Sequence, residues 1–158
     1  MTNSDFVSVG ELTSAPTREQ IDSAYRILVV DDDNDIRQLS VDVLSGSGYD
    51  VEGAQDGAAG WEALQNRHFD LMITDNKMPR MTGVELIEKL RAAHMTFPVI
   101  MASGDPPTDE FERRPWLKPA VTLQKPFSIN DLLMTVKKVL GLDNHNGIRT
   151  EAFSTKSL

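Results

Sequence analysis

Residues 26–33 read Arg-Ile-Leu-Val-Val-Asp-Asp-Asp, and this stretch decides how the rest of the chain is interpreted. The aliphatic run 27–30 is continuous instead of alternating, as in a strand buried on both faces of a sheet. Acids crowd residues 32–35, where the next segment begins, and acids favour the first turn of a helix. The stretch therefore predicts a buried strand that leads directly into a helix.

The same alternation of strand and helix recurs along the chain. Strands are predicted at 26–30, 49–53, 69–74, 98–101 and 120–123. Helices are predicted from the acidic segment to Gly46, over 57–66, over 83–93, and from a cap at Ser128 or Asn130 to Gly141. Short apolar strands separated by amphipathic helices imply βαβ units with right-handed crossovers. The predicted fold class is α/β, a doubly wound five-stranded parallel sheet.

The fourth helix is expected to be irregular. Four prolines fall within residues 106–119, and an interior proline removes a hydrogen-bond donor and clashes with the preceding turn. A short, frayed or 3₁₀-like element is predicted there. In the last helix the predicted inward residues are Ile129, Leu132, Leu133, Val136 and Leu140. The methionines, Met72, Met101 and Met134 among them, are interpreted as core-filling residues.

Composition excludes several classes of protein. Twenty-four Asp and Glu against sixteen Lys and Arg give a net charge of −8, which argues against direct nucleic-acid binding. The absence of cysteine excludes disulfides, iron–sulfur clusters, thiol catalysis and cysteine zinc sites. No apolar run approaches the roughly 18–20 residues of a membrane span. Residues 1–10 lack the features of a secretory signal. We expect a cytoplasmic protein that does not enter a membrane.

Three segments are predicted. Residues 1–25 form an N-terminal extension, in which residues 17–20 fit a capping box ahead of a short helix, with a disordered lead-in as the alternative. Residues 26–142 form one domain. Residues 143–158 form a polar tail, too short for a DNA-binding or catalytic unit.

Polar side chains stand where the predicted strands end. Asp31 and Asp32 end the first strand, Asp75 the third, Ser103 the fourth and Lys125 the fifth. Parallel sheets place ligands beyond these ends. Two carboxylates about 4 Å apart repel by roughly 4 kcal/mol at an effective dielectric near 20, so a hard cation such as Mg²⁺ is expected beside them. A carboxylate beside Mg²⁺ and a lysine can serve as nucleophile toward a phosphoryl group.

These motifs resemble the response-regulator receiver domains of two-component signalling. The matching stretches are 27–33, 72–79 with Gly83, 98–104 and 123–127, within a resemblance that runs from Arg26 to about Leu142. The resemblance is to the stand-alone type, similar to the chemotaxis response regulator. It implies a flavodoxin-like (βα)5 fold with strand order 2-1-3-4-5.

The resemblance also implies a role for each matched residue. Asp75 accepts phosphate from a histidine kinase or a histidine phosphotransfer protein. Mg²⁺ is the implied cofactor, with Asp31, Asp32, Asp75 and the backbone carbonyl of Lys77 as ligands. Ser103 moves toward the phosphoryl group in the active state. Lys125 pairs with that group, and the bond from Lys125 to Pro126 is cis.

The implied function is a phosphorylation-activated switch. Phosphorylation alters binding to a downstream protein target or passes phosphate on, and a homodimer is compatible with the sequence. Such a protein catalyses only its own phosphorylation and dephosphorylation, so it is not a turnover enzyme. Thr122 stands where many family members carry an aromatic residue, so Ser103 is expected to signal through backbone shifts.

Four alternatives stay open at this stage. One is a pseudo-receiver scaffold that is never phosphorylated, and another is a receiver detached from a hybrid histidine kinase. A Mg²⁺-dependent phosphohydrolase usually has a second aspartate two residues after the first, where this chain has Lys77. A flavodoxin-like electron carrier needs a Ser-, Thr- and Gly-rich loop after the first strand, where residues 31–33 are all aspartate.

Overall fold

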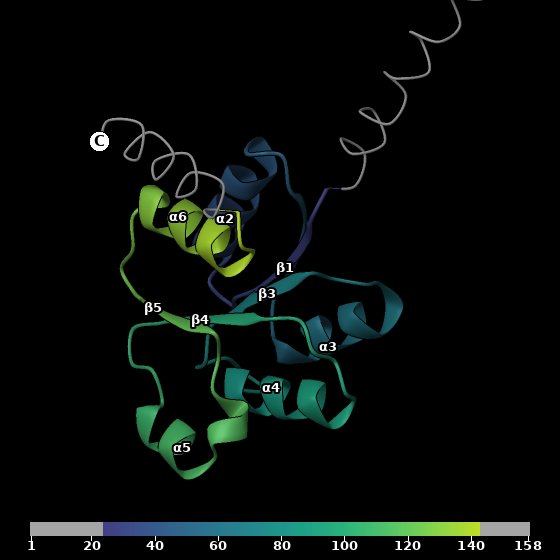
Figure 1. Ribbon diagram of the computed structural model, residues 1–158, viewed down its shortest axis with the longest axis vertical. Helices are drawn as coiled ribbons and strands as arrows, with labels where there is room; N and C mark the ends of the chain where they lie inside the picture. The colour runs from purple at the N-terminus through teal and green to yellow at the C-terminus, as the bar shows by residue number, and fades with distance from the viewer. Residues whose placement is uncertain (1–23, 143–158) are drawn as a thin grey trace, which may run out of the picture.

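The computed structural model describes residues 24–142. Five strands form one parallel sheet in the order β2-β1-β3-β4-β5, as predicted (Figure 1). The strands are β1 (Arg26–Val30), β2 (Asp50–Ala54), β3 (Leu71–Thr74), β4 (Val99–Ser103) and β5 (Val121–Gln124). Because every neighbouring pair runs parallel, all five carboxyl ends lie at the same edge of the sheet.

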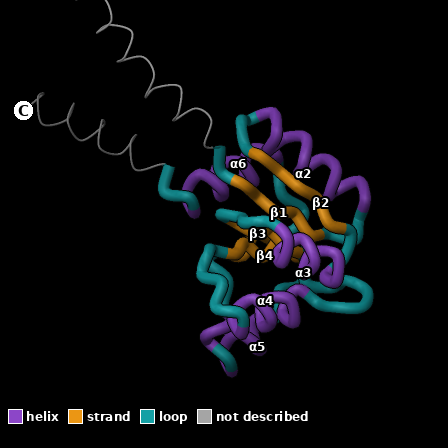
Figure 2. Tube along the Cα trace, turned by 90° about the vertical axis from the view of Figure 1, so that its right-hand side faces the viewer, coloured by secondary structure: helices purple, strands orange, loops and turns teal. Residues whose placement is uncertain are grey.

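Helices connect the strands and cover both faces of the sheet. They are α2 (Asn34–Gly46), α3 (Gly57–Asn66), α4 (Gly83–Ala92), α5 (Thr108–Arg113), the 3₁₀ turn η1 (Pro115–Leu117) and α6 (Ile129–Val139). Helices α2 and α6 lie on one face, and α3, α4 and α5 lie on the other (Figures 1 and 2). The predicted doubly wound α/β fold is confirmed.

The aliphatic run of β1 is divided between two cores. Ile27 and Val29 join the core under α2 and α6, whereas Leu28 and Val30 join the core under α3 and α4. All four side chains are fully buried. Burial of such a side chain is worth about 1.5–3 kcal/mol, so a strand covered on both faces gains from an unbroken apolar run.

Helix starts are set by short polar side chains. Asp33 caps α2, Asp56 caps α3, and Thr82 and Ser128 begin α4 and α6 with complete capping boxes. Each cap satisfies backbone N–H groups that the first turn leaves unpaired. Of the two caps predicted for the last helix, the structure selects Ser128.

The fourth helical segment is short and irregular, as predicted. Helix α5 has six residues and is followed at once by η1. The side chains of Phe111 and Leu117 are buried in the core under α3 and α4 and anchor this segment there. Arg114 pairs with Glu110 within the segment and with Glu88 of α4, the latter at 2.8 Å. Packing and ion pairs therefore hold an element that its prolines keep from forming a longer helix.

Two predicted core residues are exposed, so those predictions were wrong. Ile129 is 49% exposed because it stands in the first turn of α6, where with Leu39 it lines an apolar hollow of about 310 Å³ between α2 and α6. Met134 is 59% exposed because it lies two residues from the buried Leu132, which places it on the opposite side of the helix. Met72 and Met101 are buried, as predicted.

The predicted helix after residues 17–20 and the predicted tail 143–158 lie outside the described residues. Within residues 24–142, no helix combines the length and the apolar character needed to cross a membrane.

Candidate functional site

Acidic side chains from separate strands meet at the carboxyl edge of the sheet. Asp31 and Asp32 follow β1 and Asp75 follows β3, and one carboxylate oxygen from each lies within 4.8 Å of the other two. Strands β1 and β3 are neighbours, with Val30 opposite Thr74, so the residues after them emerge side by side. The structure therefore brings together the three carboxylates predicted from the sequence.

Lys125 reaches the same cluster from the end of β5. Its Nζ donates to Oδ2 of Asp31 at 2.9 Å and to Oδ2 of Asp75 at 3.2 Å. The side chains of Lys125, Asp31 and Asp75 are only 17%, 6% and 13% exposed. With all groups ionised, three carboxylates and one ammonium leave two net negative charges at this edge.

Burial and charge shift the pKa values of two groups in the cluster. Burial raises the pKa of Asp31, and its hydrogen bonds with Lys125 and the Asp33 N–H oppose the rise without cancelling it. Burial lowers the pKa of Lys125, but the hydrogen bonds and charges of Asp31 and Asp75 outweigh burial and raise it overall. Lys125 therefore stays protonated at neutral pH, and ionised Asp31 costs the folded state free energy that a cation would offset.

The main chain around Asp31 is fixed from several sides. Its N–H donates to the Ala54 carbonyl of β2 at 3.1 Å, and its own carbonyl accepts from Arg37 Nη1 of α2 at 2.8 Å. Its Oδ1 accepts the Asp33 N–H at 2.9 Å. The carboxylate is thus aimed at the cluster by the strand, the turn and the helix together.

The start of α4 supports Asp75 from behind. The Asp75 N–H donates to the Val30 carbonyl at 3.0 Å, and its Oδ1 accepts the Asn76 N–H at 2.6 Å. Asn76 in turn accepts the Gly83 N–H at 2.9 Å and the Val84 N–H at 3.1 Å. A Cβ at Gly83 would lie only 2.2 Å from the Asp75 carbonyl oxygen, so no other residue fits there without a shift.

Ser103 and Lys77 flank the cluster. Ser103 ends β4 and is buried, and its Oγ accepts the Asp105 N–H at 3.2 Å. Its carbonyl accepts the Lys125 N–H at 3.0 Å, and the following peptide bond, Lys125 to Pro126, is cis as expected. The Lys77 ammonium pairs with the exposed Asp105 carboxylate at 3.2 Å. A metal-binding role for the Lys77 carbonyl stays a prediction.

Three residues around this site were not predicted from the sequence. Asp56 is buried, caps α3 and forms an ion pair with Arg80, and Arg37 supports the Asp31 carbonyl. The position of Asp56 just before a predicted helix was a usable signal for a cap. Neither arginine carries a local signal, because each acts on a partner that the fold brings to it.

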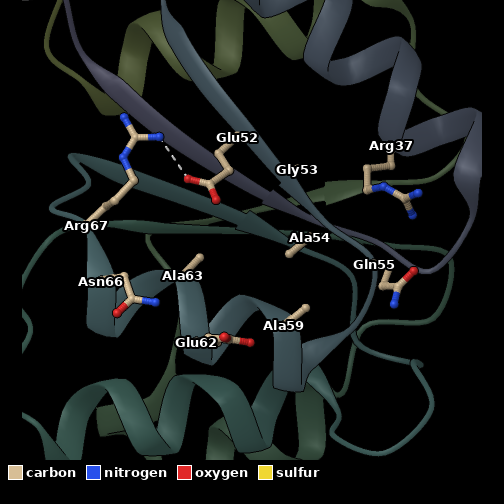
Figure 3. Close-up of a pocket in the computed structure, with 10 residues that line it drawn as sticks. All are labelled: Arg37, Glu52, Gly53, Ala54, Gln55, Ala59, Glu62, Ala63, Asn66 and Arg67. Carbon is tan, nitrogen blue, oxygen red and sulfur yellow. Dashed lines mark hydrogen bonds and ion pairs between the residues drawn. The ribbon is translucent and has the colours of Figure 1, made fainter.

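A second hollow is lined by residues of β2, α2 and α3 and by none of the three clustered aspartates. Figure 3 shows the residues that line it. Its volume is about 430 Å³. Its floor is built of small residues, and the Arg67 guanidinium at its rim is paired with Glu52 at 3.0 Å and with Asp50 at 3.3 Å. Because the Arg67 guanidinium is already paired with carboxylates, it is not free to bind an anion, and the acidic cluster is the candidate site.

The sequence matches the family model for the response regulator receiver domain over residues 27–137. The chain belongs to this family. It is thus a receiver domain of the two-component response regulators. The response regulator receiver protein CpdR of Brucella abortus is 33% identical over 121 residues, which cover 73% of this chain and 96% of CpdR. Other curated relatives are longer, and the chain spans about half the length of MprA from Mycobacterium sp. (strain KMS), at 34% identity.

Solved receiver domains share the fold. A CheY-like receiver domain protein from Methanospirillum hungatei JF-1 is 31% identical, with a TM-score of 0.71 over 78% of this chain and 99% of that chain. Response regulator TrrA from Thermotoga maritima is 27% identical, with a TM-score of 0.63 over 73% of this chain and 98% of its own, and was solved in complex with Mg²⁺-BeF. Receiver domains are signalling switches built on this sheet.

The cluster in this receiver fits Mg²⁺. Its donors are all carboxylate oxygens, which suit a hard divalent cation. The excess negative charge and the raised pKa of Asp31 are the electrostatic conditions that a bound cation relieves.

Replacing Asp31 with asparagine is expected to stabilise the metal-free protein at pH 7 by about 1 kcal/mol, because it removes a negative charge that burial disfavours. Because the folded-state pKa of Asp31 is raised, its ionised form destabilises the fold above that pKa, and the cost fades as the pH falls through it. Urea unfolding in EDTA at pH 7 and near pH 4 measures both effects. Asp42→Asn, at an exposed position of α2, is the matched control. A less stable Asp31→Asn protein at pH 7 would contradict the expectation.

Proposed function

We propose that this receiver is a phosphorylation-activated switch in which Asp75 accepts a phosphoryl group from a histidine kinase or a histidine phosphotransfer protein. The observation that carries the proposal is the position of the Asp75 carboxylate, held by Lys125 at 3.2 Å and clustered with Asp31 and Asp32. The names of the relatives support it, since CpdR and TrrA are both response regulators.

Asp75 acts as the nucleophile. One of its carboxylate oxygens attacks phosphorus, a P–O bond forms as the P–N bond to the donor histidine breaks, and the imidazole leaves with the electron pair. Lys125 stays protonated and offsets negative charge beside the transferred oxygens. Bound Mg²⁺ supplies further positive charge; its proposed ligands are the carboxylates of Asp31, Asp32 and Asp75 and the carbonyl of Lys77.

Ser103 links the site to the surface. Its hydroxyl accepts the Asp105 N–H at the turn that leads from β4 to α5. Movement of this hydroxyl toward a phosphorylated Asp75 would break that bond and shift the turn. Thr122 of β5 is exposed and carries no aromatic ring that could follow the movement. The change is therefore transmitted by the backbone of the α5 segment.

The output of the switch is altered binding to a downstream protein, or transfer of the phosphoryl group to another histidine. We place the protein in the cytoplasm, with residues 26–142 as the receiver and without direct contact to nucleic acid, and a homodimer is compatible with this role. Catalysis is limited to its own phosphorylation and dephosphorylation.

Incubation with a small-molecule phosphodonor and Mg²⁺ tests the proposal. Intact-mass measurement is expected to show a gain of about 80 Da, the mass of one phosphoryl group, in the wild type and none in Asp75→Asn. Asp70→Asn, just before β3, is the matched control and is expected to gain the same mass as the wild type. A mass gain that persists in Asp75→Asn would show that another residue is the phosphoryl acceptor. No gain in a wild type that binds Mg²⁺ favours a pseudo-receiver.

A further inference from the structure

A second charged pair lies beside the acidic cluster. The Arg80 guanidinium donates through Nε at 3.1 Å, and also through Nη2, to Oδ2 of Asp56. The Asp56 side chain is only 4% exposed, whereas the Arg80 side chain is 67% exposed. A charge buried this deeply needs its partner, so the position of the arginine is tied to that of the carboxylate.

The two oxygens of Asp56 serve two different segments. Its Oδ1 accepts the Ala59 N–H at 2.8 Å and so fixes the start of α3. Its Oδ2 holds Arg80, in the loop between β3 and α4. The Ala59 N–H and then the Arg80 guanidinium keep the pKa of Asp56 below its ordinary value. The carboxylate is therefore an ionised link between α3 and that loop.

The loop backbone at Arg80 has an unfavourable conformation. Its φ of 69° lies in the left-handed region, where glycine is favoured over other residues. The Met81 N–H donates to the Pro79 carbonyl at 2.8 Å, which closes a tight turn around this residue. A Cβ at Gly57 would lie 2.7 Å from Met81, so the loop sits directly against α3. A guanidinium at such a position points to a role for the side chain.

This loop borders the acidic cluster. Asp32, Asp56, Pro79 and Arg80 all line one hollow of about 380 Å³, so the ion pair lies next to a carboxylate of the cluster. The loop begins just after Asp75, and Arg80 stands three residues after Lys77. Whatever fixes Arg80 therefore also restrains the main chain that carries the proposed carbonyl ligand.

We propose that Arg80 is a positioning residue, whose ion pair with Asp56 holds loop 76–82 in the conformation that binds Mg²⁺. Arg80 is not itself a ligand, and it acts through the main chain of the loop. The inference deepens the proposed function and rests on the Mg²⁺ site of that proposal. Partners that orient metal ligands commonly change metal affinity by about 10- to 100-fold when they are lost.

Calorimetric titration with Mg²⁺ alone measures the effect without any phosphodonor. Arg80→Met and Asp56→Asn are each expected to weaken Mg²⁺ binding about tenfold, because the exposed Arg80 charge is screened by water and the loss of loop positioning outweighs its removal. The double variant is expected to bind no more weakly than either single variant, because both remove the same ion pair. Arg80→Lys should restore part of the affinity. Arg26→Met, which loses an exposed ion pair with Asp50 at the opposite edge of the sheet, is the matched control with unchanged affinity.

Amide hydrogen exchange in EDTA gives a second, metal-free measurement. Loss of the ion pair is expected to speed exchange at Met81, whose N–H closes the loop turn, but not at Asp33, whose N–H is bound by Asp31. If Arg80→Met does not fold, Arg80→Gly replaces it, since glycine relieves the left-handed backbone while removing the guanidinium.

Three outcomes overturn the inference. Unchanged Mg²⁺ affinity in a folded Arg80 variant does so, as do additive losses in the double variant. A wild type that binds no Mg²⁺ removes the inference and the proposed function together. If the wild type binds Mg²⁺ and gains a phosphoryl group while the Arg80 variant binds Mg²⁺ equally well, the inference is refuted and the proposed function stands.

Discussion

Replacing Gly83 with alanine is expected to destabilise the protein by about 3 kcal/mol and to prevent phosphorylation of Asp75. The added Cβ would lie 2.2 Å from the Asp75 carbonyl oxygen and 3.0 Å from the Asn76 Cα. Both are backbone atoms, so neither can rotate away as a side chain would. The start of α4 must then move off the loop that holds the acceptor carboxylate.

Urea unfolding and phosphodonor labelling measure the two effects of Gly83→Ala. Gly46→Ala is the matched control, because a Cβ at the end of α2 meets no atom within 4 Å. That change is expected to be neutral or to stabilise the protein by up to about 1 kcal/mol through helix propensity. If the stability of Gly83→Ala lies within about 1 kcal/mol of the wild type and its labelling is normal, the loop can shift to accommodate the added Cβ, and the expectation is wrong.

The features that could be predicted from the sequence are those encoded by neighbouring residues. The run 27–30 identifies a strand buried on both faces, because apolar side chains on both sides leave no alternation. Five strands that alternate with helices indicate a parallel sheet, and a parallel sheet brings Asp31, Asp75 and Lys125 to one edge. The cluster was therefore predictable once the strand ends were known.

The features that could not be predicted depend on geometry that only the folded chain has. Arg80 and Asp56 are 24 positions apart, and their contact requires the left-handed backbone at Arg80. Ile129 is exposed because the first turn of α6 lies where the core ends. The helical period of the sequence does not indicate where along the helix that point lies. Periodicity gives the inward side of a helix but not the point at which the core ends.

Replacing Lys125 with methionine is expected to change two properties in opposite directions. Phosphoryl acceptance should fall about 100-fold, because the charge that faces the transferred oxygens is lost. Mg²⁺ binding should tighten by up to about tenfold, or 1.4 kcal/mol, because the ammonium that pairs with Asp31 and Asp75 repels a cation in the same cluster. Labelling with a phosphodonor and calorimetric Mg²⁺ titration measure the two properties separately.

Because phosphoryl acceptance and Mg²⁺ affinity are expected to change in opposite directions, the Lys125 variant tests the electrostatics of the cluster. If the lysine only held the fold together, its loss would weaken both properties, since the disordered carboxylates would also bind Mg²⁺ less well. Lys137→Met, at an exposed position of α6, is the matched control and should change neither property. Weaker Mg²⁺ binding in Lys125→Met would mean that Lys125 organises the carboxylates more than it neutralises them. Unchanged phosphoryl acceptance would show that Lys125 does not stabilise the transferred oxygens, and the stabilising charge would then come from Mg²⁺.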